Sequence, residues 1–264
     1  MTTTELNLFP DAEVRASKPE GMTLDEWRLR LELAACYRVF EHRGWAEEIF
    51  NHITARVPGP ERHYLINPFS LTYGEVTATN LVKVDMAGRT VGDNPYPVNR
   101  AGFVIHSAIH GAREDAHCVI HTHHTAGVAV SCKADGLRMD NFYAAFLYGR
   151  VAYHDFDGVV VHEHEQERLV ASLGDKNVLI LRQHGLLTAG HDIPTAFYWL
   201  YVLQRACEVQ LAADSMSGPT LKLTQQACEV SSRDVQETDP QRDLFPKVFA
   251  AAVRRAGVTL PQLL

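Results

Sequence analysis

Apolar residues recur at helical spacing in several segments of the chain. In the first of them, Thr23 is suited to cap a helix, and the apolar spacing continues to Gly44, a residue type that commonly ends helices. The same spacing predicts four later helices, over residues 101–113, 125–134, 163–173 and 193–214. Pro194 falls in the first turn of the last helix, where proline is tolerated.

Alternating or continuous apolar runs between these segments predict short strands. The strands are expected over residues 49–57, 64–68, 81–85, 117–123, 159–161 and 178–181, and residues 186–190 continue the last one. A hairpin turn is predicted at residues 86–89, and a loop with two prolines at residues 94–99.

The polar segments predict one domain with an extension at each end. Residues 1–22 are polar and contain two prolines, so we expect a loose N-terminal arm. No repeat or low-complexity linker divides residues 23–215, which we interpret as a single domain. Residues 216–264 are expected to form a helical tail packed on that domain.

Composition and charge narrow the class of protein. The 264 residues are 46% hydrophobic and 22% charged, which is typical of a soluble globular protein. Lys and Arg number 25 against 32 Asp and Glu, with no basic stripe, so we expect no nucleic-acid partner. No apolar run approaches the ~18–20 residues that span a bilayer, so we expect no membrane insertion. Five cysteines without a CxxC pair favour reduced thiols and a cytoplasmic location.

Two histidines follow a short apolar run in the predicted strand 117–123. His121 and His123 are two residues apart, so their side chains share one face of the strand. His184 comes soon after another buried strand. Three imidazoles at one rim can bind a Zn²⁺ or similar ion at ~2.0–2.1 Å and leave a coordination position open, as catalytic metal sites do. The alternative is three ordinary histidines in a chain that has 14.

A second HxH motif shows that the spacing alone is not specific. His162-Glu163-His164 has the same form, but it opens a charged predicted helix. We therefore expect it to lie on an exposed helix face rather than in a metal site.

Several motifs occur in the order and spacing of the class II aldolase/adducin family. The segment 120–131 resembles that family's metal-binding strand, and 182–186 resembles the segment with its third metal ligand. Three more segments resemble family motifs, namely 51–56, 66–85 and 103–115. The resemblance covers roughly residues 25–215.

This resemblance implies a fold, a cofactor and an assembly. The fold would be an α/β three-layer α/β/α sandwich with a central mixed, mostly antiparallel sheet. Each subunit would bind one divalent metal ion through His121, His123 and His184, with Zn²⁺ favoured and Fe²⁺, Mn²⁺ or Co²⁺ as alternatives. The chain would form a homotetramer with its sites near subunit interfaces.

The departures from the family bear on the substrate. Gly102 stands where the sugar-phosphate aldolases of the family carry their acid/base glutamate. Phe50 and the pair Phe69-Ser70 replace the glycine and the Thr-Gly of the family's phosphate-binding segments. Phenylalanine offers an apolar wall and no donor for phosphate, so the substrate expected here is not phosphorylated. The motif around Gly102 is closest to the adducin-like branch, which includes non-catalytic scaffolds.

Other side chains are candidates for substrate binding or support. Asn51, Phe50, Phe69, Ser70 and Arg100 are expected to line the substrate site, and Arg100 could also catalyse by pairing with a substrate carboxylate or could form a structural salt bridge.

Further histidines lie close to the predicted metal ligands. His124 is a candidate proton shuttle or a rim residue, and His106 is expected to support a metal ligand from behind. A tyrosine acting across a subunit interface, as in the family's aldolases, cannot be chosen from the sequence.

Three functions follow from these candidates. The first is a metal-dependent lyase that cleaves a C–C bond next to a carbonyl or carboxylate of a small, non-phosphorylated oxo or hydroxy acid, aromatic acids included, by decarboxylation or retro-aldol cleavage. The second is a non-haem Fe(II) oxygenase that uses the same three histidines on a 2-oxo or aromatic acid. The third is a non-catalytic adducin-like interaction module.

Overall fold

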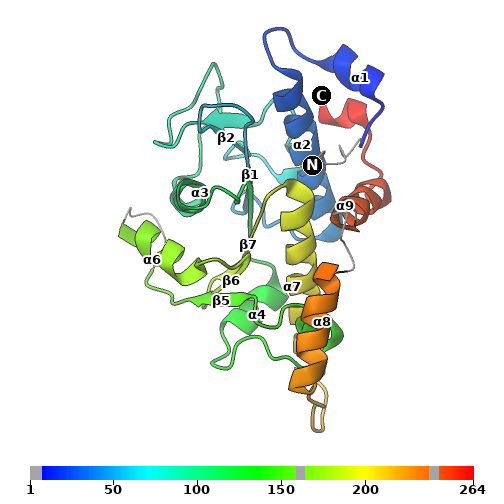
Figure 1. The fold of residues 1–264 in the computed structure, drawn as a ribbon. Coiled ribbons are helices and arrows are strands. Elements are labelled where there is room, and N and C mark those ends of the chain that lie inside the picture. The colour runs from blue at the N-terminus through cyan, green and yellow to red at the C-terminus, as the bar shows by residue number, and fades with distance from the viewer. Residues whose placement is uncertain (1–7, 159–163, 238–243) are drawn as a thin grey trace.

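A seven-stranded sheet runs through the middle of the molecule (Figure 1). The computed structural model describes residues 8–158, 164–237 and 244–264, and of residues 100, 101, 164, 236 and 237 the backbone alone. The strands are β1 (His52–Arg56), β2 (Tyr64–Ile66), β3 (Val82–Val84), β4 (Cys118–Thr122), β5 (Val151–His154), β6 (Val178–Leu181) and β7 (Gly185–Gly190). Their order is β3-β2-β1-β4-β7-β6-β5, and all neighbours are antiparallel except β5 and β6.

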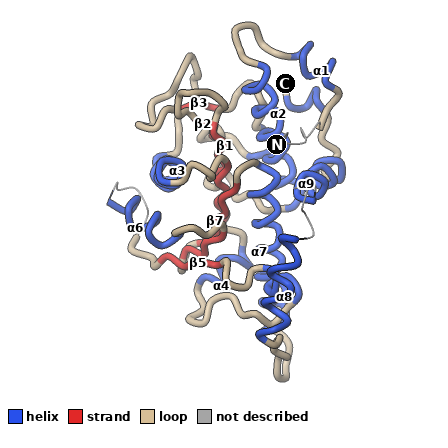
Figure 2. Tube along the Cα trace, in the orientation of Figure 1, coloured by secondary structure: helices blue, strands red, loops and turns tan. Residues whose placement is uncertain are grey.

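Helices cover both faces of this sheet (Figure 2). They are α1 (Asp11–Ser17), α2 (Leu24–Arg43), α3 (Arg100–Ala112), α4 (Thr125–Ser131), α5 (Phe142–Phe146), α6 (His164–Leu173), α7 (Ile193–Asp214), α8 (Gln225–Glu237) and α9 (Leu244–Arg255). Two short 3₁₀ helices, η1 (Tyr73–Glu75) and η2 (Leu260–Leu263), complete the described elements. None of the described helices combines the length and the apolar character that crossing a bilayer requires.

Alternation along the central strands creates two separate cores. On β4, Ile120 belongs to the large core that α2 and α7 cover. Val119 belongs to a second core with residues of α3 and α6 on the opposite face. Because successive strand side chains point to opposite faces, one strand serves both layers. The expected three-layer α/β/α sandwich with a mixed, mostly antiparallel sheet is confirmed.

Local signals fix the ends of the two long helices. The Thr23 side chain accepts a hydrogen bond from the Glu26 amide at 3.2 Å, and Gly44 ends α2 in the left-handed conformation with φ 66°. Asp192 caps α7 by accepting from the Thr195 amide at 2.8 Å. These helices form the main layer on one face of the sheet.

The predicted strand continuation after residue 181 is wrong. β6 and β7 are antiparallel, so the chain reverses between them and forms a hairpin. The reversal places His184 in the turn, directly before β7. β5 and the short helix α5 were not predicted, and the strand predicted at residues 159–161 lies outside the described residues.

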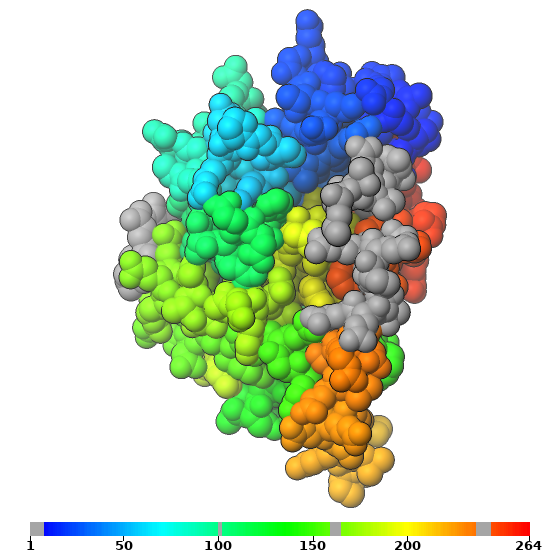
Figure 3. Space-filling model, in the orientation of Figure 1, coloured from blue at the N-terminus to red at the C-terminus, as the bar shows by residue number. Residues whose placement is uncertain are grey.

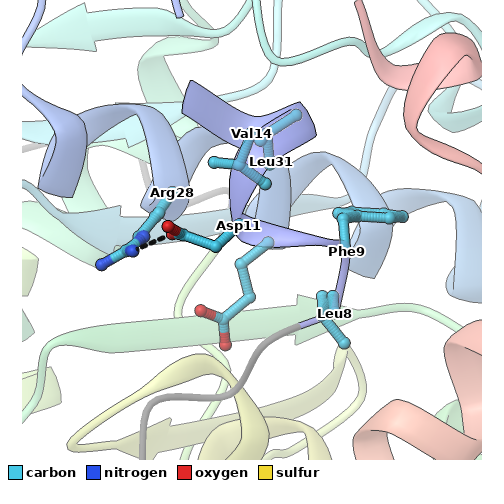
Figure 4. Close-up of a pocket in the computed structure, with 7 residues that line it drawn as sticks. Leu8, Phe9, Asp11, Val14, Arg28 and Leu31 are labelled. Carbon is cyan, nitrogen blue, oxygen red and sulfur yellow. Dashed lines mark hydrogen bonds and ion pairs between the residues drawn. The ribbon is translucent and has the colours of Figure 1, made fainter. Parts of the chain in front are cut away.

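The expectation of a loose arm is wrong for residues 11–17. They form α1, which buries Val14 and places Ser17 to accept a hydrogen bond from Trp27 Nε1 at 3.2 Å. Figure 4 shows the Asp11–Arg28 ion pair of α1 and α2 beside apolar side chains that line a small pocket. Apolar packing and this ion pair therefore anchor the segment to α2.

The C-terminal helices lie against the central layers. α8 packs on α5, and α9 packs on α7 and α2. The Leu263 carbonyl accepts a hydrogen bond from the Ala78 amide at 2.7 Å, which ties the last residues to the first half of the chain. Figure 3 shows α8 and the segment before it at the lower end of the molecule. The division of the chain at residues 22 and 215 stays a prediction.

Candidate metal centre

Three imidazoles meet at one edge of the sheet. His121 is the next-to-last residue of β4, His123 lies just past the end of that strand, and His184 directly precedes β7. β4 and β7 are paired, with Thr122 opposite Leu186, so the end of one strand lies beside the start of the other. The Nε2 atom of His123 is 2.8 Å from Nε2 of His121 and 3.0 Å from Nε2 of His184.

Hydrogen bonds on the far side of two rings orient these nitrogens. His121 Nδ1 lies 2.9 Å from the Leu186 carbonyl oxygen, and His123 Nδ1 lies 2.8 Å from a carboxylate oxygen of Glu47. Both partners only accept, so each Nδ1 carries the proton and donates it. The Nε2 lone pairs of these rings then face each other. Lone pairs facing at this distance repel unless they share a cation.

Burial keeps the imidazoles in the neutral form that binds metals. Burial, together with the nearby His184 and His123, lowers the pKa of His121 well below its ordinary value. Burial is also the main cause that lowers the pKa of His184 from 6.5 to about 4. Both rings are therefore neutral at neutral pH, with one nitrogen available to bind a metal ion.

The ring geometry fits a divalent ion after a small adjustment. Zn–N bonds of ~2.0–2.1 Å in a tetrahedral site separate the ligand nitrogens by about 3.3 Å. The two separations from His123, 2.8 and 3.0 Å, need to widen by only a few tenths of an ångström, and the ligand atoms of all three residues lie within 4.8 Å of one another. Borderline ions such as Zn²⁺, Fe²⁺ and Co²⁺ prefer imidazole. Among the described residues, these three form the one group of His, Cys, Asp or Glu side chains that is arranged to bind a metal ion.

The turn that holds His184 is tightly constrained. Gln183 adopts a positive φ of 57°, which non-glycine residues rarely do. Gly185 lies so close to β4 that a Cβ there would be 2.3 Å from the Thr122 carbonyl oxygen. A side chain at position 185 would therefore push the third imidazole away from the other two.

A buried histidine that the sequence did not single out lies behind His121. The ring of His52 is 5.2 Å from that of His121, and the ring of His106 is 4.6 Å from that of His52. His106 Nδ1 hydrogen-bonds Thr54 Oγ1 at 2.6 Å. The predicted support by His106 thus reaches His121 through His52. Only the pairing of β1 with β4 could have identified His52, because it places His52 directly opposite His121.

The ring of His52 fills the space next to Gly102. A Cβ at position 102 would lie 2.2 Å from His52 Cδ2. Real Cβ atoms do not approach other atoms so closely, and the ring is buried. The position at which the family's aldolases carry a glutamate is therefore closed to any side chain in this fold.

The predicted substrate-binding residues differ in their burial and in their place in the fold. Asn51 is buried beside His52. Its Nδ2 donates to the Trp45 carbonyl at 3.0 Å, while its Oδ1 has no hydrogen-bond partner among the residues that the structure describes. Phe50 is 52% exposed. Phe69 and Ser70 lie in the loop after β2, and Ser70 has a φ of 102°.

Of the two other catalytic candidates, the structure describes the side chain of His124 alone, and His124 is not a member of the imidazole cluster. His124 caps α4, and its Nδ1 is hydrogen-bonded by Gln204 Nε2 on α7. Burial lowers the pKa of His124. Arg100 begins α3, but its side chain lies outside what the structure describes, as does the second HxH motif at 162–164.

Glu47 was missed as a site residue. It lies in the loop after α2 and is 76 residues from His123 in sequence, so no local motif links the two. The contact forms only because the loop returns to the end of β4.

Comparison with known proteins decides the family. The model of the Class II Aldolase and Adducin N-terminal domain matches residues 31–211, which include all three imidazoles. The chain belongs to this family. It is 50% identical over 190 residues to a Pseudomonas aeruginosa protein provisionally named as a class 2 aldolase, covering 72% of this chain and 73% of that protein.

Two further similarities show the breadth of the class II aldolase and adducin family. Rat alpha-adducin is 44% identical over 212 residues, which cover 79% of this chain but 29% of that longer protein. The crystal structure of an aldolase II superfamily protein from Pseudomonas syringae superposes with a TM-score of 0.83 at 42% identity, covering 89% of this chain and 94% of that one. The family thus includes proteins named for aldolases and proteins named as adducins.

Proposed function

We propose that the protein is a divalent-metal-dependent lyase that cleaves a C–C bond next to a carbonyl or carboxylate. The observation that carries this proposal is the convergence of three imidazole Nε2 atoms, with Nδ1 protons held by Leu186 and Glu47 on two of the rings. A scaffold has no use for lone pairs that face and repel each other without a cation. Family membership and the aldolase-named relative support a lyase.

The metal supplies one element of this chemistry and the chain supplies the rest. When bound, a divalent ion acts as a Lewis acid on oxygens of the substrate next to the scissile bond. His121, His123 and His184 would hold it. Leu186 and Glu47 keep two of these rings in the tautomer that presents Nε2.

Decarboxylation agrees with the closed position at Gly102. Retro-aldol cleavage in the family's sugar-phosphate aldolases uses a glutamate at that position, and the ring of His52 leaves no room for one. Loss of CO₂ from a carboxylate on the carbon next to a carbonyl needs no base to begin. The electron pair of the broken C–C bond passes into that carbonyl as an enolate, which then takes a proton from water. We therefore favour decarboxylation over retro-aldol cleavage for this chain.

The proposed substrate is a small, non-phosphorylated oxo or hydroxy acid, aromatic acids included. The half-exposed Phe50 offers an apolar surface beside Asn51, whose unpartnered Oδ1 can accept a hydrogen bond from a substrate hydroxyl. We propose that Arg100 pairs with the substrate carboxylate and that Phe69 and Ser70 complete the wall. His124 is proposed as a rim residue that Gln204 holds.

A screen of 2-oxo and hydroxy acids tests the lyase. The metal-loaded protein is incubated with aliphatic and aromatic acids, and released CO₂ and aldehyde are measured. We expect CO₂ from at least one acid and none with His184→Ala. The proposal fails if the metal-loaded protein releases neither product from any acid, or if His184→Ala retains full activity.

The all-imidazole ligand set favours one second candidate, a non-haem Fe(II) oxygenase. Imidazole suits Fe²⁺ as well as Zn²⁺. Oxygen uptake coupled to consumption of an aromatic 2-oxo acid by the Fe²⁺-loaded protein would identify it. CO₂ release from the Zn²⁺-loaded protein without oxygen would exclude it as the main activity.

Similarity to alpha-adducin supports a third candidate, a non-catalytic interaction module. This candidate predicts that the three imidazoles are dispensable and that metal is absent or sub-stoichiometric after purification without chelators. We also propose that the protein works in the cytoplasm as a homotetramer, with the metal centres near subunit interfaces.

A further inference from the structure

A second polar pocket lies at the junction of three helices. The end of α2, the middle of α7 and the end of α9 enclose a cavity of about 300 Å³. Its walls are His42, Arg43, Trp45, Arg205, Glu208, Ala252 and Arg255. None of the three imidazoles of the metal centre lines it, so it is a separate site.

Positive charge in this pocket is not balanced. It contains three arginines and one carboxylate, that of Glu208. Arg205 Nη1 pairs with this carboxylate, and Gln204 Nε2 donates to its other oxygen at 3.2 Å. Arg43 and Arg255 have no ion pair or side-chain hydrogen bond with any residue that the structure describes. Two positive charges therefore remain for a ligand.

Aromatic rings hold Arg43 in place without satisfying its donors. The guanidinium carbon lies 5.0 Å from the ring centre of Trp45, 5.2 Å from that of Tyr201 and 5.8 Å from that of Phe197. Such contacts fix the planar group through its face. No described residue accepts a hydrogen bond from the N–H groups at its edge. An ordered, half-buried guanidinium with free donors is prepared for a planar or tetrahedral oxyanion.

The surroundings of Arg43 make this charge unfavourable without a ligand. Burial and the neighbouring Arg255 and Arg205 lower the pKa of Arg43. An anion between the arginines would remove the repulsion. The pocket volume is at the lower end of the range for small-molecule sites.

We propose that this pocket binds the phosphoryl or carboxylate group of a small anionic molecule between Arg43 and Arg255. Glu208 stays paired with Arg205 and limits the site to one such group. The proposal does not depend on the lyase, because it uses none of the metal-binding residues.

Titration calorimetry at constant ionic strength tests the site. Inorganic phosphate represents a phosphoryl group and malonate represents carboxylates, and each is titrated into the full-length, metal-loaded protein. We expect saturable binding of at least one anion, weakened about tenfold or more by Arg43→Gln and by Arg255→Gln. The matched control is Arg254→Gln, on the same helix and outside the pocket, which should change the affinity less than about twofold.

One further variant locates the binding, and thermal unfolding controls for folding. His184→Ala should bind the same anion as the wild type, since the metal centre is not involved. Thermal unfolding shows which arginine variants are folded, and the exposed Arg255 carries the test if Arg43→Gln unfolds. The proposal is overturned by the absence of saturable binding of both anions, by unchanged affinity in the folded arginine variants, or by binding that His184→Ala loses.

Discussion

At the residue scale, the metal centre depends on what lies behind each ligand. A ligating histidine needs one nitrogen free and the other held, and the chain provides the Leu186 carbonyl for His121 and the Glu47 carboxylate for His123. The carbonyl comes with the β4–β7 pairing. The carboxylate comes from a loop, so it is the partner that mutagenesis can remove cleanly.

Removal of Glu47 should weaken metal binding. With Glu47→Ala, His123 loses the acceptor that fixes its tautomer, and we expect the affinity for Zn²⁺ to fall about 10- to 100-fold. Competition with a chromophoric chelator measures the affinity directly. Glu48→Ala is the matched control, since Glu48 is adjacent and makes no contact with the three imidazoles in the described structure. Equal affinities of the two variants would refute the role of Glu47.

The close fit of Gly102 and His52 makes a second residue-scale prediction. Gly102→Ala should lower the free energy of unfolding by about 1–3 kcal/mol, because its Cβ overlaps the buried His52 ring. In a protein that already carries His52→Ala, the overlap is gone. Gly102→Ala should therefore lower the free energy of unfolding much less in that protein than in the wild type. Urea unfolding of both single variants and the double variant gives the coupling. Additive losses would show that the ring does not close this position.

His110 should make the fold sensitive to acid. Burial lowers its pKa from 6.5 to about 3, while it hydrogen-bonds Thr54 and the Ala116 carbonyl. Between pH 6.5 and 3 the unfolded chain therefore binds a proton that the folded chain does not, so stability falls as pH falls. The loss should be about 1.4 kcal/mol per pH unit below 6.5 from this residue.

The variant His110→Asn isolates that contribution. Urea unfolding at pH 7.5 and pH 5 should show a smaller drop for the variant than for the wild type, even if the variant is less stable at both values. An identical drop would assign the acid sensitivity to other groups.

At the element scale, the site is made by the ends of strands that are distant in sequence. β4 delivers His121 and His123, and the β6–β7 hairpin delivers His184 beside them. Gly185 permits this approach because a Cβ there would meet β4. The strand pairing, rather than any local motif, sets the distances between the ligands.

The sequence predicted most of these elements because their patterns are local. Helical spacing and the cap at Thr23 identify α2, and the apolar run before His184 identifies β6. β5 was not predicted because its four residues lie at the sheet edge. Two of their side chains are half-exposed, so the sequence shows no clear pattern of apolar residues there. α1 escaped because its seven residues bury a single side chain, Val14.

The three histidines of the candidate site could be predicted because strand spacing and family motifs both indicate His121, His123 and His184. The contacts of His52 and Glu47 with them could not, because these arise through strand pairing and the return of a loop. The lack of space at Gly102 likewise arises because α3, which carries Gly102, packs against His52 of β1. Such contacts between distant segments leave no periodic signal in one sequence.

At the scale of the whole molecule, the surface suggests self-association. Phe142 is 66% exposed on α5, and Met216 and Leu221 are 71% and 89% exposed in the segment before α8. Large apolar side chains gathered at one end of a protein often mark an interface. α5 packs on α8, the helix that follows the segment with Met216 and Leu221.

Light scattering coupled to size exclusion tests the proposed homotetramer. We expect a mass of four times the 29.5 kDa chain. Phe142→Glu places a charge in the exposed apolar region and should shift the protein toward smaller species. A wild-type protein that elutes as a monomer at micromolar concentration would contradict the tetramer.

The central claim is that three histidines hold one divalent ion, and metal content tests it most directly. The protein is purified without chelators and analysed by inductively coupled plasma mass spectrometry, alongside His184→Ala and the control His124→Ala, all checked for folding by circular dichroism. We predict close to one divalent ion per chain in the wild type and in His124→Ala, and almost none in His184→Ala. A folded His184→Ala protein with full metal content, or a wild type that takes up no divalent ion when one is supplied, would contradict the account.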